Sequence, residues 1–279
     1  MSKIQCQWSP TLGALEDTHE NTWGTINYTD PEAPCVFFGV YGLPDFWKIW
    51  RHKGKRYVFW AGSDIVHLQN GYHLEDGGNI RVDSTPLAQW LDKYCENWCE
   101  NEVERKALKD MGITAFIGQS FLGNVEDYEA TFEPSERPQV YLSANPGREE
   151  EYGWGVIEKI ADSCNVDFHL YGSPDWQTEH QNVFVKGRVP KEEMNEQIKK
   201  MQCGLRLNAF DGFSEVTAKS ILWGQYPITP ESFKYPHIEG YRSLNHLIWL
   251  LNRLKLKNKV NPARKHYQSN LNNFPWNQK

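Results

Sequence analysis

The amino-acid sequence predicts an α/β protein made of two doubly wound, Rossmann-like domains. Short apolar runs rich in β-branched and aromatic residues alternate with amphipathic helical patterns, and Gly, Pro or Asp turns separate them. This alternation predicts parallel sheets with helices on both faces. It stops once and then restarts, and 279 residues are enough for two domains of about 140 residues each.

In the first half, a strand is expected to begin before Trp8. The alternation then predicts strands at 35–41, 56–61, 94–98 and 113–117, and helices at 45–52, 86–92 and 102–110. In the last of these helices Val103, Ala107 and Leu108 mark one apolar face, and Gly112 separates it from the next strand. Trp8, Trp47, Trp50 and Trp60 lie in apolar patterns, so we expect them in the core rather than at a sugar-binding surface.

Residues 127–138 interrupt the pattern with two prolines and no apolar period, which indicates an interdomain linker. The second half predicts strands at 139–143, 166–171, 182–185, 204–208 and 226–229, and helices at 149–163, 191–200, 214–223 and 243–254. We therefore expect an N-terminal domain over residues 1–130 and a C-terminal domain over 138–255. The polar tail 256–279 ends with Phe274 and Trp276, which favour docking onto the first domain, with a loose terminus as the alternative.

Composition limits the class of protein. The sequence is 39% hydrophobic and 24% charged, and no apolar run approaches the roughly 20 residues that span a bilayer, so a soluble globular protein is expected. The first residues lack a signal-peptide pattern, which indicates a cytoplasmic location. The six cysteines match no disulfide framework, and the pair Cys95 and Cys99 is a weak metal signal without further ligands.

Charge is unevenly distributed along the chain. The net charge of −6 argues against a protein that coats nucleic acid. Residues 240–279 nevertheless contain no Asp or Glu and eight basic residues, namely Arg242, Arg253, Lys255, Lys257, Lys259, Arg264, Lys265 and Lys279. This segment is either an edge that faces a polyanion or a solvated tail.

Residues 211–229 form the most informative motif. They predict a glycine turn, a short helix and a buried strand, and the N–H groups at the start of such a helix favour an anionic ligand. No GxGxxG follows a strand and no GxxxxGK[ST] occurs, so a dehydrogenase or a P-loop enzyme is disfavoured. In doubly wound domains ligands bind at the carboxyl ends of the strands, and we expect a site in a cleft between the two domains.

This motif resembles the donor-binding domain of the GT-B glycosyltransferases, in particular the retaining family 4. The family pattern is an acidic residue, Gly-Phe-Gly, a short helix with a second Glu, and Gly-x-Pro-Val. The matching residues here are Asp211, Gly212, Phe213, Ser214, Gly224, Pro227 and Ile228. Supporting segments follow in the family's order, with Gly147-Arg148, Tyr171-Gly172 and 185–189 in the second half, and 58–64 and 95–113 in the first.

Two departures from the family pattern concern the donor site. Lys219 stands where the family has its second Glu, near the ribose, and no lysine follows Arg148 to complete the family's diphosphate clamp. Lys219 is therefore a candidate to replace that lysine, and the alternative is a surface lysine of an amphipathic helix. Arg206 lies in a strand that is otherwise apolar and needs a partner, either Asp211 or a donor phosphate.

The resemblance implies a glycosyltransferase that moves a sugar from a UDP- or GDP-type donor to an acceptor hydroxyl, without metal or other cofactor and with retention. The sequence contains no DxD triplet. The candidate catalytic residues are Asp64, Arg148 and Lys219; the candidate donor-binding residues are Gly147, Lys186, Gly187, Arg206, Asp211, Gly212, Phe213, Ser214 and Glu215; the candidate acceptor-binding residues are Gly62, Ser63 and His67. The N–H groups of 212–215 would stabilise the departing diphosphate.

Several alternatives stay open from the sequence. Asp64 either binds the acceptor hydroxyl or caps a helix over 65–68, and His67 either lines the cleft or is structural. The acceptor could be a polyanion, such as modified bases of viral DNA or an anionic surface, bound by the basic tail. A catalytically silent nucleotide-binding protein and a sugar-phosphate isomerase or epimerase are the other functional classes.

Overall fold

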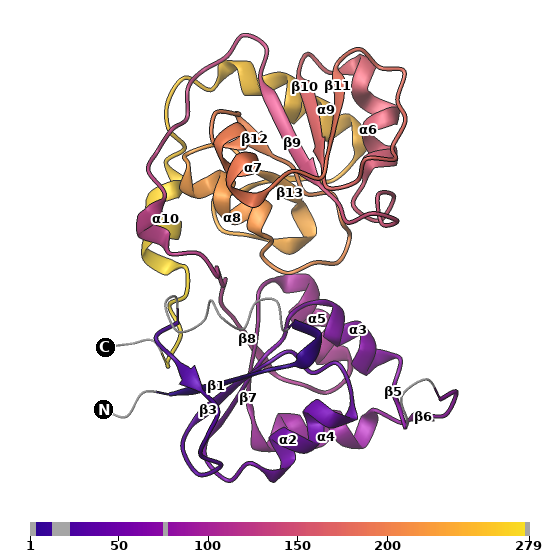
Figure 1. Cartoon of the computed structure of the whole chain (residues 1–279), viewed down its shortest axis with the longest axis vertical. Helices are drawn as coiled ribbons and strands as arrows, with labels where there is room; N and C mark the ends of the chain where they lie inside the picture. Colours follow the sequence, from indigo (N-terminus) through magenta and orange to yellow (C-terminus); the bar gives the residue numbers. More distant parts are fainter. Residues whose placement is uncertain (1–3, 13–22, 75–77, 277–279) are drawn as a thin grey trace. The chain divides into compact units, whose positions relative to one another are not determined.

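The computed structural model describes residues 4–12, 23–74 and 78–276. The chain divides into two compact units (Figure 1). Unit 1 comprises residues 1–124, 210–213 and 270–279, and unit 2 comprises 125–209 and 214–269. Both units are α/β with parallel sheets, which confirms the predicted fold class.

Unit 1 contains a six-stranded sheet in the order β2-β1-β3-β4-β7-β8 whose neighbouring strands are all parallel. Its strands are β1 (Gln5–Trp8), β2 (Ile26–Asn27), β3 (Cys35–Phe38), β4 (Arg56–Phe59), β7 (Glu96–Cys99) and β8 (Ala115–Ile117). The helices are α2 (Leu43–Arg51), α3 (Ser63–Gln69), α4 (Thr85–Tyr94) and α5 (Glu102–Asp110). A small antiparallel pair, β5 (Tyr72–His73) and β6 (Arg81–Val82), completes the unit.

Alternating side chains of β3 divide between two apolar clusters, as expected for a strand buried on both faces. Cys35 and Phe37 belong to a cluster that includes residues of α2, α3, α4 and α5. Val36 and Phe38 belong to an aromatic cluster on the opposite face of the strand. That aromatic cluster contains Trp8, Trp23, Phe38, Tyr57, Phe59 and Phe274, with Trp98 and Trp276 packed against it.

The C-terminal segment supplies part of this aromatic cluster. The ring of Phe274 is fully buried, with its centroid 5.2 Å from that of Phe59 and 5.5 Å from that of Trp98. Asn272 anchors the segment, since its side-chain oxygen accepts hydrogen bonds from the Phe121 N–H at 2.8 Å and the Trp23 ring N–H at 3.1 Å. Residues 256–269 belong to unit 2, so the tail is divided between the units.

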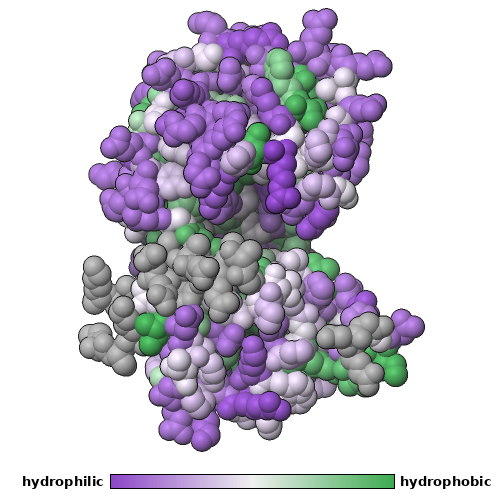
Figure 2. Space-filling model, viewed as in Figure 1, coloured by the Kyte–Doolittle hydropathy of each residue, from purple (hydrophilic) through white to green (hydrophobic). Residues whose placement is uncertain are grey.

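Unit 2 contains a four-stranded parallel sheet in the order β11-β10-β9-β12. Its strands are β9 (Gln139–Ser143), β10 (Asp167–Tyr171), β11 (Val183–Gly187) and β12 (Cys203–Gly204). A two-stranded pair joins β13 (Ile228–Pro230) to β14 (Glu239–Tyr241). The helices are α6 (Trp154–Ile160), α7 (Lys191–Ile198), α8 (Glu215–Leu222), α9 (Leu244–Arg253) and α10 (Ala263–Asn270), the last of which ends in unit 1. Hydrophilic residues cover most of the visible face of this unit (Figure 2).

Several predicted elements differ from the observed ones. The helix predicted at 149–163 begins only at Trp154, because turns occupy 149–153 and Gly153 adopts a left-handed φ of 83°. The strand predicted at 204–208 ends at Gly204, after which one bridge joins Leu205 to Ile228. Residues 128–138 contain neither helix nor strand, but they are fixed in unit 2, where Phe132 is buried and its N–H bonds to the Trp223 carbonyl.

Candidate functional site

The strand order of unit 2 marks one edge of its sheet as a binding edge. Strands β9, β10 and β11 follow one another to one side, and β12 then lies on the other side of β9. The connections therefore reverse direction between β9 and β12, and ligands of open α/β sheets bind at the carboxyl ends of the strands at such a point. Ser143 is the last residue of β9 and lines a pocket of about 420 Å³.

Three cationic side chains line this pocket, which we call the donor pocket after the ligand that the sequence predicts. Arg188 and Lys191 come from the turn after β11 and the start of α7, and Lys219 comes from α8. Val189, Met194 and Ile198 add apolar surface on the α7 side. Three cations beside an apolar wall suit a ligand that carries phosphate groups and a planar base.

Lys219 is a buried residue, not a surface lysine, which removes one of the two alternatives. Its exposed fraction is 6%, and its Nζ lies 2.8 Å from Glu215 Oε2, one helical turn earlier. Burial by itself would raise the pKa of Glu215, but the charge and hydrogen bond of Lys219, with the charge of Lys191, outweigh burial and lower this pKa. Glu215 therefore stays ionised and holds Lys219 at the pocket wall.

The start of α8 adds backbone donors to the donor pocket. Ser214 is its N-cap residue, with an extended backbone, and its Oγ accepts the Thr217 N–H at 3.3 Å. Glu215 and Val216, the first two residues of the helix, line the pocket. The positive end of a helix dipole thus meets the same space as the three cations.

Three of the predicted donor-site residues, Gly147, Arg148 and Arg206, lie outside the donor pocket. The Arg148 guanidinium bonds the carboxylate of Glu151 and lies 5.3 Å from the ring centroid of Tyr152, over which Arg206 lies at 4.3 Å. The hydrogen bond and charge of Arg148 lower the pKa of Glu151. Gly147, at a left-handed φ of 80°, donates its N–H to Glu149. The structure places Arg148 with Glu151 and Tyr152, and none of these residues is among the described residues that line the donor pocket.

Lys186 and Gly187 also lie outside the pocket lining. Lys186 is exposed at the end of β11, with its Nζ 5.5 Å from the centroid of the Phe184 ring. Gly187 adopts a left-handed φ of 66°, and its carbonyl accepts the Gly172 N–H at 2.8 Å. Arg188, the next residue, lines the donor pocket instead. Sequence reasoning missed Arg188 and Lys191, although both follow the end of a parallel strand.

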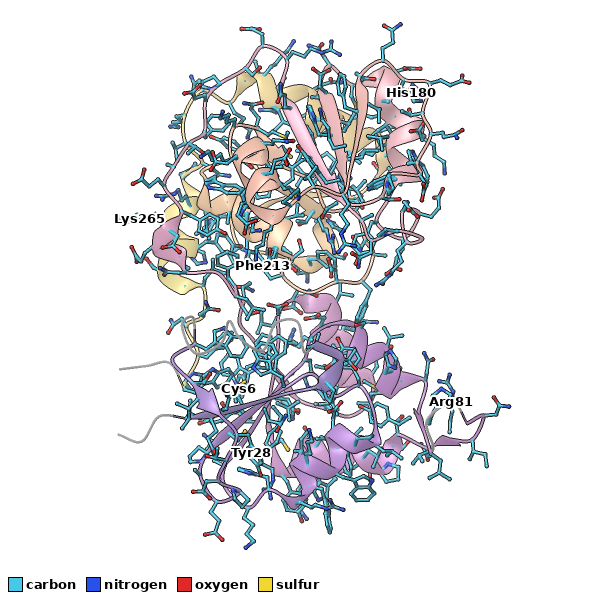
Figure 3. The ribbon with its side chains drawn as sticks, in the orientation of Figure 1. Cys6, Tyr28, Arg81, His180, Phe213 and Lys265 are labelled. Carbon is cyan, nitrogen blue, oxygen red and sulfur yellow. The ribbon has the colours of Figure 1, made fainter. Side chains whose placement is uncertain are left out.

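Residues 211–213 belong to unit 1, not to the domain that contains the donor pocket. The N–H of Phe213, which is labelled in Figure 3, donates to Glu100 Oε2 at 2.7 Å, and the Asp211 carbonyl accepts from Asn101 Nδ2 at 2.6 Å. The Phe213 N–H is therefore occupied, contrary to the expectation that it faces a diphosphate. A Cβ on Gly212 would lie 2.2 Å from Glu100 Oε2, so a larger residue would displace this carboxylate from its hydrogen bonds.

Two buried glutamates form the acidic group that holds this segment, and sequence reasoning missed both. Glu100 Oε1 accepts from the N–H and the Oγ of Ser120 at 2.9 and 2.6 Å. Glu104 Oε2 accepts the Glu100 N–H at 2.7 Å, while its Oε1 has no hydrogen-bond partner among the described residues. Burial, and then the charge of Glu100, raise the pKa of Glu104 well above its usual range. The signal in the sequence was Glu100 directly after a buried strand, followed by Glu104 in the next helix.

Asp64 is neither exposed to an acceptor nor the N-cap of its helix. The N-cap of α3 is Gly62, and the fully buried Asp64 lies within the helix. Its Oδ1 accepts from the N–H groups of Ala61 and Ile65, at 3.0 and 2.9 Å, and its Oδ2 accepts from Val40 N–H at 2.9 Å. Burial raises the pKa of Asp64 to about 7, against the lowering effect of these bonds. Asp64 joins the loops that follow β3 and β4.

The remaining acceptor candidates divide between this packing and a small surface cavity. Gly62 has a left-handed φ of 88°, and a Cβ there would lie 3.2 Å from Glu104 Oε1. Ser63 Oγ lies 3.1 Å from the hydroxyl oxygen of Tyr41, whose ring contacts that of His67 with centroids 5.5 Å apart. His67 lines a cavity of about 140 Å³ together with Tyr41 and Arg81, the last marked in Figure 3.

A larger hollow of about 540 Å³ occurs in unit 2, but it lies at the wrong edge of the sheet. Its lining includes Arg137, which precedes β9, and Asn182, which precedes β11. The amino ends of parallel strands are not where α/β sheets bind their ligands. We therefore assign the site from strand polarity and charge instead of volume.

The GT-B glycosyltransferases have two α/β units, each with a parallel sheet. Comparison with solved structures shows the same fold in this chain. The lipopolysaccharide outer core galactosyltransferase WaaB has a TM-score of 0.61 and 14% identity, with 97% of this chain and 96% of that chain covered. Sucrose-phosphate synthase from Thermosynechococcus elongatus has a TM-score of 0.58 and 11% identity, with 93% and 72% covered. At these identities the likeness concerns the fold alone.

TarM from S. aureus, solved in complex with UDP, has a TM-score of 0.56 and 12% identity, over 84% of this chain. This chain spans about half of TarM, covering 52% of it. In comparisons by sequence, no protein-family model and no curated protein matches the chain. Among the described residues, no helix is both long and apolar enough to cross a membrane, and no group of three or more His, Cys, Asp or Glu side chains is placed to hold a metal ion.

Proposed function

We propose that the chain is a glycosyltransferase that binds a nucleoside diphosphate sugar in the donor pocket and transfers the sugar to an acceptor hydroxyl. The observation that carries this proposal is the meeting of Arg188, Lys191 and Lys219 with the start of α8, beside the carboxyl end of β9. Fold neighbours support it, since TarM was solved with UDP and HepE from Anabaena with UDP and glucose. A UDP-type donor is therefore the first to test.

In the proposed reaction the bond from the anomeric carbon to the diphosphate breaks and a bond to the acceptor oxygen forms. The electron pair of the broken bond leaves with the diphosphate, which gains negative charge, and the hydroxyl proton passes to this leaving group or to water. Lys219 would stabilise this charge from a fixed position, because Glu215 holds its Nζ at 2.8 Å. We further propose that these cations serve where other enzymes use a metal ion, and that the anomeric configuration is retained.

The donor pocket is tested by calorimetric titration of the whole protein with UDP. Lys219→Ala removes a charge-assisted contact, so we expect UDP affinity to fall about ten-fold to a hundred-fold. The matched control is Lys200→Ala, an exposed lysine of the same unit that does not line the pocket. Unchanged affinity in Lys219→Ala, together with lost affinity in Arg148→Ala, would move the diphosphate to the Arg148 group.

Catalysis is tested separately with a panel of nucleotide sugars and no added acceptor. A transferase releases sugar slowly to water, so we expect UDP to accumulate with one or a few donors. Addition of EDTA should leave this rate unchanged if the cations of the pocket act alone. Binding of UDP without hydrolysis of any donor would favour the catalytically silent nucleotide-binding protein.

For the acceptor we propose a small or polymeric hydroxyl compound ahead of DNA. Two basic residues of the tail are engaged within unit 2: Arg264 donates to the carbonyls of Leu222 and Tyr128, and Lys257 pairs with Glu239 at 2.8 Å. A polyanion would thus meet fewer cations than the sequence suggests. A steep salt dependence of acceptor binding would support a polyanion after all.

A further inference from the structure

Helix α2 turns two tryptophans toward solvent. Leu43, Phe46 and Ile49 follow one another at intervals of three residues. They form the inward face of the helix and are buried in the core of unit 1. Trp47 and Trp50 therefore lie on the outer side, with exposed fractions of 42% and 50%, so their prediction as core residues is wrong. Trp8 and Trp60, at 2% and 0%, are core residues as predicted.

Helices α2 and α4 lie side by side (Figure 1), and the two tryptophans belong to a row of rings that crosses from one helix to the other. The row runs from Trp50 to Trp47, Phe46, Trp90 and Tyr94, with successive centroids 5.7, 5.4, 5.5 and 5.1 Å apart. Tyr94, at the end of α4, is 48% exposed. We call Trp47, Trp50, Trp90 and Tyr94 the aromatic face.

Basic side chains lie on the same two helices as the aromatic face. Lys48, Arg51 and Lys93 are exposed, and no carboxylate in the described part of the chain lies within ion-pair distance of them. Lys93 Nζ lies 5.1 Å from the ring centroid of Tyr94. The exposed acid of these two helices is Asp92, whose carboxylate accepts the Thr114 N–H at 2.7 Å. Exposed cations thus accompany the aromatic face on both helices, with Lys48 on the side where α2 meets Gln7 and Trp8.

These features select among possible partners. In a symmetric dimer the face would meet itself, and its three cations would repel their own copies. Double-stranded nucleic acid offers phosphates but no surface for exposed indole rings. The interfacial region of an anionic bilayer satisfies both features, because Trp and Tyr favour the headgroup level and Lys and Arg are attracted to anionic lipids.

We propose that the aromatic face binds the surface of an anionic lipid bilayer, with Trp47 and Trp50 in the headgroup region and Lys48, Arg51 and Lys93 against lipid phosphates. Binding through a few side chains, without a membrane-spanning segment, is peripheral and reversible. The proposal goes beyond the proposed function and does not depend on it, since the aromatic face lies in unit 1 and the donor pocket in unit 2.

The test is co-sedimentation of the whole protein with vesicles of phosphatidylcholine, alone or mixed with phosphatidylglycerol. We expect binding to the mixed vesicles only, weakened by salt. The double variant Trp47→Ala/Trp50→Ala should bind roughly ten-fold more weakly. Lys48→Ser/Arg51→Ser, which leaves the rings in place, should lose about five-fold for each cation. The matched control Trp249→Ala removes a tryptophan that is 49% exposed on α9, and its binding should equal that of the wild type.

Each other outcome overturns the proposal. Equal sedimentation with both kinds of vesicle, or no sedimentation at all, excludes recognition of anionic lipid. Unchanged binding in both double variants places any lipid contact elsewhere. A dimer in analytical ultracentrifugation that is lost in Trp47→Ala/Trp50→Ala would make the face a self-association surface. Tight binding to a single-stranded oligonucleotide without vesicle binding would make it a nucleic-acid surface.

Discussion

Asp64 shows how a single carboxylate can organise two loops. Its oxygens accept three backbone N–H groups, two of which belong to the loops after β3 and β4. In Asp64→Asn an NH₂ group replaces one carboxylate oxygen and faces a backbone N–H that then has no acceptor. We therefore expect a loss of about 1–3 kcal/mol in the free energy of unfolding. Urea denaturation measures this loss. Asp175→Asn, at an exposed position, is the control, and equal stability of the two variants would contradict the assignment.

Glu104 makes stability depend on pH. Its pKa is raised well above the usual value in the folded state, mainly by burial, so the folded chain keeps a proton that the unfolded chain releases. Stability from this group is complete below the ordinary pKa of Glu, about 4.3, and is lost as the pH rises toward the folded pKa.

Glu104→Gln imitates the protonated acid and should remove this dependence. We expect the free energy of unfolding to fall less steeply between about pH 5 and pH 8 in the variant than in the wild type. Urea denaturation at a series of pH values provides the comparison. Glu102→Gln, on the same helix but partly exposed, should keep the wild-type slope. Parallel curves for wild type and Glu104→Gln would show that Glu104 is ionised in the fold.

At the scale of elements, the C-terminal segment works as part of the unit 1 core. Phe274 is fully buried among the rings of Phe59 in β4, Trp98 in β7 and Trp23. Phe274→Ala should therefore lower the free energy of unfolding of unit 1 by about 3–5 kcal/mol. Chemical denaturation followed by tryptophan fluorescence reports this, since the cluster contains several tryptophans. Trp276→Ala, at the margin of the cluster, should cost less, and a reversed order would contradict the packing.

Element prediction succeeded where apolar periodicity was strong and failed where backbone geometry decided. The alternation located the strands of the unit 2 sheet, those of the unit 1 sheet except the two-residue β2, and helices such as α5 and α8. It did not locate β14, because Glu239–Tyr241 has no apolar period and is a strand only through its pairing with β13. The late start of α6 depends on the left-handed Gly153, which periodicity does not show.

At the scale of the whole molecule, the fold was predictable and the site was only partly so. The motif at 211–229 pointed to a phosphate site. Ser214 is the N-cap of α8, and Glu215 and Lys219, one helical turn apart, line the donor pocket. The partner of Phe213 could not be predicted, because Glu100 is 113 residues away in the sequence. Contacts over such separations depend on tertiary structure, which a local pattern does not contain.

A ligand should act on the two units unequally. The donor pocket is lined by residues of unit 2, so UDP at about one hundred times its Kd should stabilise that unit by about 2.7 kcal/mol. In hydrogen exchange we expect slower exchange in β9 and α8, with β3 and β4 less affected. Slower exchange confined to unit 1 would show that the nucleotide binds there and would contradict the assignment of the donor pocket.

The division of the chain also bears on the order of synthesis. Unit 1 takes residues from the beginning, the middle and the end of the chain, including Phe213 and Phe274. A ribosome delivers Phe274 only after all of unit 2 has been made, so the core of unit 1 stays incomplete until then. Unit 2, although second in the sequence, is the first to have its full set of core residues. We therefore expect nascent chains to acquire a protease-resistant unit 2 before a protease-resistant unit 1.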